Sequence, residues 1–207
     1  TLNDYDVALW NPYYHDEPPK PAAVQTLRCL SRFVQQGGGL LLIGNALYAL
    51  PDLLGLSLPQ PEPKGFTNFY KDYTPSGIRP AEKMTRHPLF ERLTPDASDN
   101  ASYTFVDPDR WDVFKTMQWV DSKVLRRGGT LLATLNGRLA KEFGAGTPCL
   151  WEFTHGHGQI VAYALNLRRG HGTQDTWAPS ANELRFVQNA VRYLVNTSNA
   201  PRVVMLW

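Results

Sequence analysis

Apolar positions in the first part of the chain form two short runs with a helical pattern between them. Residues 5–10 and 40–43 are almost continuously apolar, which is typical of strands buried on both faces of a parallel sheet. Pro21 suits the first turn of a helix, and the glycines at 37–39 suit its end. The helix is predicted to bury an apolar stripe made of Val24, Leu27, Leu30 and Val34. This pattern predicts a right-handed strand–helix–strand unit.

The middle of the chain is predicted to contain shorter strands connected by irregular segments. A proline-rich stretch at 51–63 predicts a short helix near residues 52–54, followed by a loop. Further strands are predicted at 113–120, 130–135, 148–154 and 159–165. The last two are joined by His155-Gly156-His157-Gly158, whose glycines predict a hairpin turn.

A capped helix and a final apolar run close the chain. Ser180 and Glu183 have the spacing of a capping box, in which each side chain satisfies a free backbone N–H. One helix face then repeats apolar residues, at Leu184, Val187, Val191 and Leu194. After a break at 196–201, the run 202–207 has the composition of one more strand. Strands alternating with amphipathic helices predict an α/β fold.

Composition narrows the class of protein. The 207 residues suffice for one domain over 1–207, and 43% hydrophobic with 19% charged residues is ordinary for a globular protein. The net charge is +2 and no run of Lys or Arg stands out, so nothing indicates binding to nucleic acid or to an anionic membrane. The longest apolar run, at 40–43, is far shorter than the roughly 20 residues that span a bilayer.

The cysteines, aromatic residues and first residue carry weaker signals. Cys29 falls in a helical pattern and Cys149 in a strand pattern, which predicts two buried free thiols. Aromatic residues make up 12% of the chain, and those in loops either stack on sugars, anchor an interface or pack beneath the loops. Thr1 is not a natural start, so the chain is predicted to be processed or excised. This leaves the compartment open, with a secreted or periplasmic location favoured.

Five stretches, in their order and spacing, match a known pattern. They are Asp4-Tyr5-Asp6-Val7, Phe33-Val34-x-x-Gly37-Gly38-Gly39-Leu40, His87-Pro88-Leu89, Gly156-x-Gly158-Gln159-Ile160-Val161-Ala162-Tyr163, and the later His171. Over residues 4–195 the chain resembles the ThuA-like (trehalose-utilisation) branch of the class I glutamine-amidotransferase-like superfamily. The resemblance implies a flavodoxin-like, mostly parallel sheet flanked by helices, and a setting in sugar metabolism.

The chain lacks the nucleophile that glutaminase chemistry requires. Glutaminase domains place a cysteine at a sharp strand-to-helix turn, where a positive helix end stabilises the thiolate. The corresponding turn here is Gly44-Asn45-Ala46, where ThuA-like proteins often carry a histidine, and the chain has no Gly-x-Ser-x-Gly elbow. An amide cannot act as this nucleophile, so glutaminase activity is not expected.

Polar residues follow the predicted core strands, where open α/β sheets bind ligands. The ligand-binding candidates are His15, Asp16, Asn45, Arg169 and His171. We expect them to line one cleft in which they bind a metal, polarise a sugar hydroxyl or hold an anion. His15 lies in a segment that looks like a His-bearing loop of some ThuA-like members, and with His171 it is the metal-ligand candidate. The alternative is a pair of solvated polar loops.

The remaining histidines are predicted to be structural. His155 and His157 would share a strand face and could bind a metal, but the glycines around them favour exposed turn residues. His87, just before Pro88, is predicted to cap or pack locally.

Two functions follow from these patterns. The first is a non-catalytic accessory domain of a larger carbohydrate-related protein, with a scaffold or sugar-binding role and no cofactor. Its partners would be a carbohydrate or other domains of the parent protein. The second is a hydrolase or isomerase acting on a sugar derivative, assisted by a divalent metal and using His15, Asp16 and His171.

The C-terminal run carries a separate prediction. The resemblance implies a central strand before Asp4, and an omitted central strand would leave its neighbours' N–H and C=O groups unpaired. We therefore predict that residues 202–207 fill this slot, as in a circularly permuted domain. The alternative is that these residues begin a neighbouring domain.

Overall fold

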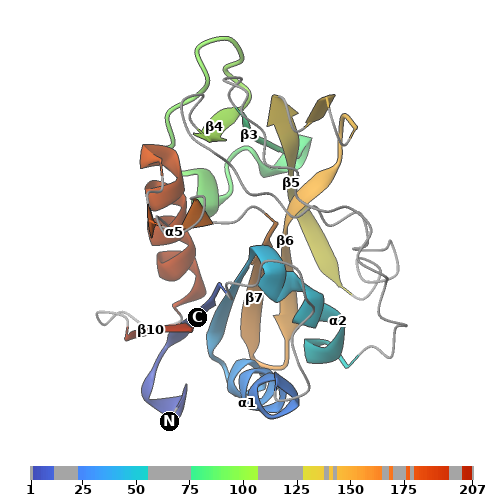
Figure 1. Ribbon diagram of the computed structural model, residues 1–207, viewed down its shortest axis with the longest axis vertical. Helices are drawn as coiled ribbons and strands as arrows, with labels where there is room; N and C mark the ends of the chain where they lie inside the picture. The colour runs from blue at the N-terminus through green and yellow to red at the C-terminus, as the bar shows by residue number, and fades with distance from the viewer. Residues whose placement is uncertain are drawn as a thin grey trace.

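Eight strands form one mixed sheet, and both apolar runs of the N-terminal part lie in its parallel half (Figure 1). The computed structural model describes residues 2–11, 23–55, 76–106, 128–137, 140–141, 144–164, 168–169, 176–177, 180–195 and 202–206. Within these ranges no helix has the length and apolar character needed to cross a membrane.

The parallel half contains four strands in the order β10-β1-β2-β7. Their bounds are Val203–Leu206 for β10, Val7–Trp10 for β1, Gly39–Ile43 for β2 and Gly158–Tyr163 for β7. Strands β1 and β2 are neighbours, as the strand–helix–strand pattern predicts. In their register Val7 lies opposite Gly39. Every residue of both strands is buried, because helices cover both faces of this part of the sheet.

The antiparallel half continues the sheet as β6-β5-β3-β4. Its bounds are Pro148–His155 for β6, Gly129–Gly137 for β5, Ser76–Pro80 for β3 and Tyr103–Val106 for β4. Strands β5, β6 and β7 confirm three of the four later strands predicted from the sequence. The strand predicted at 113–120 lies outside the described residues. A separate two-stranded ribbon pairs β8 (Arg168–Arg169) with β9 (Thr176–Trp177).

Helices cover opposite faces of the sheet (Figure 1). Helix α1 (Ala23–Gln35) contacts His155 of β6, whereas α5 (Ala181–Leu194) contacts Glu152 of the same strand through Tyr193. Side chains three apart on a strand point to opposite faces, so the two helices lie on opposite sides. The shorter elements are η1 (Leu2–Asp4), η2 (Gly44–Ala49), α2 (Leu50–Leu53), η3 (Glu82–Met84) and η4 (Pro88–Phe90).

The apolar stripes predicted for the two helices are largely confirmed, except at the first residue of each stripe. In α1, Leu30, Phe33 and Val34 are buried, but Val24 is 48% exposed and Cys29 is exposed. In α5, Leu184 is 43% exposed, so its predicted burial is wrong. Val187 and Leu194 of the predicted stripe are buried, and so is Phe186, which packs against Phe105 and Tyr163 from distant strands. The prediction of two buried thiols is therefore correct for Cys149 and wrong for Cys29.

The hairpin between β6 and β7 and the cap of α5 form as predicted. Gly156 has a φ of 64°, a left-handed conformation that favours glycine, and the next N–H, of His157, donates to the Gln35 carbonyl oxygen at 3.1 Å. At the start of α5, Ser180 Oγ accepts from the Glu183 N–H at 3.2 Å. The Ser180 N–H donates to Glu183 Oε2 at 3.1 Å. Both halves of the capping box are therefore present.

The C-terminal run pairs with β1, as predicted, but not in the centre of the sheet. Strand β10 is parallel to β1, with Val203 opposite Val7 and Leu206 opposite Trp10. Among the described strands β10 lies at the edge of the sheet, whereas the prediction places it in a central slot. Figure 1 shows the red β10 beside the blue N-terminal segment. Because β10 pairs with the outer side of β1, β1 is an interior strand with satisfied backbone groups. Circular permutation itself stays a prediction.

Candidate functional site

The structure places the backbone of two of the five predicted site residues. Asn45 lies in η2, directly after β2, and Arg169 lies in β8, after β7, but the structure does not describe their side chains. His15, Asp16 and His171 lie outside the described residues. The single cleft expected for these residues, and the metal-ligand role of His15 and His171, therefore stay predictions.

In the described part of the carboxyl edge, residues from neighbouring parallel strands lie side by side in one row. Trp10 lies opposite Leu42, so the next residue, Asn11, lies beside Ile43. Ile43 in turn lies opposite Tyr163. The Asn11 N–H donates to the Leu206 carbonyl oxygen at 3.1 Å, which extends the pairing of β1 by one residue. Alternation along the strands places this row on the face covered by α5, since Tyr163 contacts that helix.

Asn11 has an unusual environment for an amide. Its residue is only 4% exposed, and its Oδ1 atom is buried without a hydrogen-bond partner in the described part of the chain. A buried acceptor left unpaired costs about 1–3 kcal/mol. Such groups are rare in native proteins and are often explained by a bound ligand, ion or water. Asn11 therefore marks a place where a donor from outside the protein could bind.

A buried carboxyl group lies at the same edge. Glu183 is fully buried at the first turn of α5, where it completes the capping box with Ser180. The hydroxyl of Tyr163, also fully buried, lies 3.5 Å from Glu183 Oε1. The sequence predicts the cap but not this contact, because Tyr163 and Glu183 belong to different elements. The contact joins the end of β7 to the start of α5 and fixes the wall of the site.

The turn after β2 has the shape of a strand-to-helix elbow but no thiol. Gly44 has a φ of 55° and leads into η2. The chain's two cysteines lie elsewhere, in α1 and β6. Burial raises the pKa of the Cys149 thiol far above its ordinary value, so this group stays protonated and is a poor nucleophile. Its Sγ lies 3.6 Å from the Ala133 carbonyl oxygen.

A second polar cluster joins His87, Glu152 and Tyr193 on the face covered by α5. His87 Nδ1 accepts from the Leu89 N–H at 3.3 Å, which confirms the predicted local cap. Its Nε2 lies 3.3 Å from Glu152 Oε2, and the Tyr193 hydroxyl donates to the same oxygen at 2.7 Å. Both ring nitrogens of His87 are thus occupied. The sequence does not reveal the two long-range contacts, which attach η4 and α5 to β6.

These contacts shift two ionisation equilibria. The hydrogen bond from His87 lowers the pKa of Glu152, with a further contribution from the Tyr193 hydroxyl. Burial, together with the neighbouring carboxylate, raises the pKa of Tyr193 to about 12. A cluster that holds three elements together in these ionisation states is suited to stabilising the fold at neutral pH.

Glu152→Gln is expected to destabilise the protein at neutral pH but not in acid. The pKa of Glu152 is below its ordinary value of 4.5 in the folded state, so its stabilising contribution is present above that value and is lost as pH falls through the folded-state pKa. We expect a loss of about 1 kcal/mol at neutral pH, since the group is partly solvated. Urea unfolding of both proteins across the acid range measures this difference.

Glu91→Gln is the matched control, because Glu91 is exposed and, among the described residues, its carboxylate pairs with the adjacent Arg92 alone, at 3.6 Å. Its stability is expected to match the unchanged protein within about 0.5 kcal/mol at every pH. A Glu152→Gln defect that persisted undiminished in strong acid would contradict the role assigned to the carboxylate charge.

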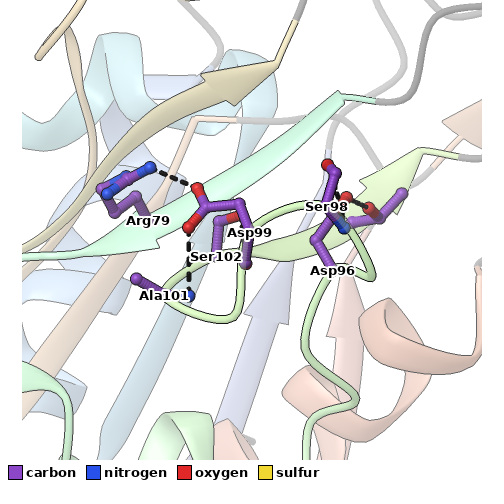
Figure 2. Close-up of polar contacts among 7 residues, drawn as sticks. Arg79, Asp96, Ser98, Asp99, Ala101 and Ser102 are labelled. Carbon is purple, nitrogen blue, oxygen red and sulfur yellow. Dashed lines mark hydrogen bonds and ion pairs between the residues drawn. The ribbon is translucent and has the colours of Figure 1, made fainter.

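The acidic loop before β4 is internally satisfied (Figure 2). Asp96 accepts from the Ser98 N–H at 2.8 Å, from the Ser98 hydroxyl at 2.6 Å and from the Thr104 hydroxyl. The Ser98 hydroxyl is the main cause of the lowered pKa of Asp96. Asp99 accepts from the Ala101 N–H at 3.1 Å and pairs with Arg79. These contacts explain the carboxylates as turn-forming groups.

His155 faces α1 and is not a free turn residue. Its Nε2 lies 3.1 Å from both Ser31 Oγ and Gln35 Nε2. The amide nitrogen of Gln35 can only donate, so Nε2 is the accepting, unprotonated nitrogen of a neutral ring. Burial lowers the pKa of His155, in agreement with this assignment. His157 is exposed at the turn, as predicted. In the described part of the chain, no three His, Cys, Asp or Glu residues are grouped to hold a metal ion.

Comparison with known proteins identifies the fold. No family model and no curated protein matches the chain. A ThuA-like protein from Bacteroides uniformis has a TM-score of 0.54 at 15% identity, covering 97% of this chain and 74% of that one. A ThuA-like protein from Parabacteroides merdae has a TM-score of 0.51 at 15% identity, covering 97% and 75%. The chain therefore has the α/β fold of ThuA-like structures, which confirms the fold class and the resemblance seen in the sequence.

Proposed function

We propose that this chain is a non-catalytic ThuA-like domain that binds a carbohydrate at the carboxyl edge of its parallel strands, as an accessory domain of a larger protein. The observation that carries the proposal is Oδ1 of Asn11 at this edge, which is buried and has no hydrogen-bond partner among the described residues. The ThuA-like fold supports the location, because open α/β sheets bind ligands beyond the carboxyl ends of their strands.

The chemistry of the edge favours binding without glutamine hydrolysis. The turn Gly44-Asn45-Ala46 offers no thiol or hydroxyl, and a glutaminase needs a thiolate there. Cys149 is fully buried in β6 and protonated. We expect no ammonia release from glutamine above the buffer rate.

The acceptor groups at the edge suit a hydroxyl-bearing ligand. An amide oxygen accepts hydrogen bonds, so Asn11 needs a donor such as a sugar O–H. A site built to hydrogen-bond a ligand hydroxyl contains a polar group that the protein itself does not pair, and Asn11 Oδ1 has no pair within the described ranges.

Asn11→Leu tests the proposal because it separates stability from binding. Leucine has a similar size and removes the unpartnered amide, so stability is expected to stay within about 1 kcal/mol or to rise. Binding of the sugar is expected to weaken about tenfold or more. Thermal unfolding measures the first effect. Two-dimensional NMR titration with trehalose, glucose, galactose and maltose measures the second.

Asn189→Leu is the matched control. Asn189 is equally buried, but its amide donates to the carbonyl oxygens of Leu89 at 3.1 Å and Glu91 at 2.8 Å. Its loss is expected to destabilise the protein by about 1–3 kcal/mol and to leave sugar affinity unchanged. The proposal is wrong if no sugar shifts resonances around Asn11. It is also wrong if Asn11→Leu destabilises as strongly as the control without affecting binding.

A further inference from the structure

A groove of about 490 Å³ lies along the outer side of α1, on the sheet face opposite to α5. Most of its lining comes from one side of that helix. The lining residues are Val24, Leu27, Arg28, Ser31, Arg32 and Gln35 of α1, with Asp52 of α2. Their spacing of three and four residues places them on one helical face. The volume lies within the roughly 300–1,000 Å³ that is usual for small-molecule sites.

The centre of the groove carries two uncompensated positive charges. Arg28 and Arg32 are one helical turn apart and both are exposed. Within the described part of the chain, neither guanidinium group has an ion-pair partner. The described lining includes one carboxylate, that of Asp52, so these residues together carry a net positive charge. Like charges at this spacing repel each other, and an anion between them would relieve the repulsion.

The ends of the groove differ in chemistry. At one end, Val24 is 48% exposed and Leu27 is partly buried, which provides an apolar surface. Toward the other end, Ser31, which lies between the two arginines, and Gln35 are held in place by His155, and Ser31 Oγ also lies 3.3 Å from the Leu53 carbonyl oxygen. The polar end is therefore fixed before a ligand arrives, which reduces the entropy lost on binding.

We propose that this groove binds a small organic anion through a carboxylate or phosphate held between Arg28 and Arg32. Guanidinium groups match both anions with paired hydrogen bonds. Ser31 and Gln35 contact the ligand's polar groups, while Val24 and Leu27 contact its carbon skeleton. The site is independent of the carbohydrate site proposed at Asn11, since it lies on the outer side of a helix covering the other face of the sheet.

NMR titration of the whole chain with glucose 6-phosphate, glucuronate and uncharged glucose tests the proposal. The two anions separate phosphate from carboxylate recognition, and inorganic phosphate alone shows whether the organic part contributes. We expect at least one organic anion to shift the amide and guanidinium signals of Arg28 and Arg32, while glucose leaves them unchanged. Affinity is expected to fall as salt is added, because the contacts are charged and exposed.

Arg28→Gln and Arg32→Gln are each expected to weaken anion binding about fivefold, and together to abolish it. Glutamine keeps helix propensity and length, so the fold is expected to remain intact. Arg192→Gln, which removes an exposed arginine from α5, is the control and should leave affinity unchanged. The proposal is overturned if no anion perturbs the groove, if glucose binds it equally well, or if the Arg192 variant loses as much affinity. Asn11→Leu is expected to weaken sugar binding and to leave anion binding in this groove unchanged. Failure of one proposal can therefore be distinguished from failure of the other.

Discussion

Gly158→Ala is expected to destabilise the protein by about 3 kcal/mol or more, because the new methyl group would meet backbone atoms that cannot move aside. A Cβ on Gly158 would lie 2.2 Å from the Gly38 carbonyl oxygen and 2.3 Å from that of Val34. The Val34 oxygen belongs to the end of α1, and the Gly38 oxygen belongs to the connection into β2. Relief of the clash would therefore require separating the helix from the β6–β7 hairpin. Since domains are stable by only about 5–15 kcal/mol, a large fall in unfolding midpoint and in soluble yield should follow.

Gly55→Ala is the control for the glycine-to-alanine change itself. Gly55 has a φ of 67°, but an added Cβ there would meet no atom of the described residues within 4 Å. The expected loss of stability is only the cost of placing alanine in the left-handed conformation, about 1–2 kcal/mol. Urea unfolding compares the two variants directly. Equal losses would show that the hairpin can shift away from α1, against the packing described for Gly158.

The glycine-spaced hairpin shows what local sequence can and cannot reveal. The spacing of Gly156 and Gly158 predicts a turn, because turn geometry depends on neighbouring residues. It does not reveal that Gly158 allows close approach to Val34, since that contact depends on how a helix far away in the chain docks. The same limit explains the error at Leu184. The sequence does not show that Phe186 joins an aromatic cluster with Phe105 and Tyr163, or that Leu184 lies outside the buried face.

The location proposed for the site follows from the sequence, but the groups that support the proposal do not. The apolar runs predict the strands and therefore the position of their carboxyl ends. Asn11, Asn45 and Tyr163 do lie at the ends of β1, β2 and β7. An asparagine after a strand is ordinary in sequence, however, and what distinguishes Asn11 is its burial with no partner for Oδ1 in the part of the chain that the structure describes. The pairing of His87 with Glu152 likewise depends on contacts between distant elements.

Trp151→Phe is expected to leave stability within about 1 kcal/mol of the original, although it removes part of a fully buried core residue. Trp151 lies in β6 between Ala162 and Leu131, and its Nε1 is buried with no hydrogen-bond partner in the described part of the chain. An unpaired buried donor destabilises by about 1–3 kcal/mol. Phenylalanine removes that donor, which offsets the roughly 1 kcal/mol lost through the smaller volume.

Two comparisons make the Trp151 result decisive. Trp151→Ala removes the whole ring and is expected to lose about 3–5 kcal/mol, which measures the contribution of the ring to packing. Phe153→Leu, at a buried position two residues along the same strand, removes volume without removing a polar group and should lose about 1 kcal/mol. Denaturant midpoints at constant slope give all three values. If Trp151→Phe lost about 3 kcal/mol, the indole N–H would have a partner in solution, such as an enclosed water, because a satisfied donor contributes stability that phenylalanine cannot replace.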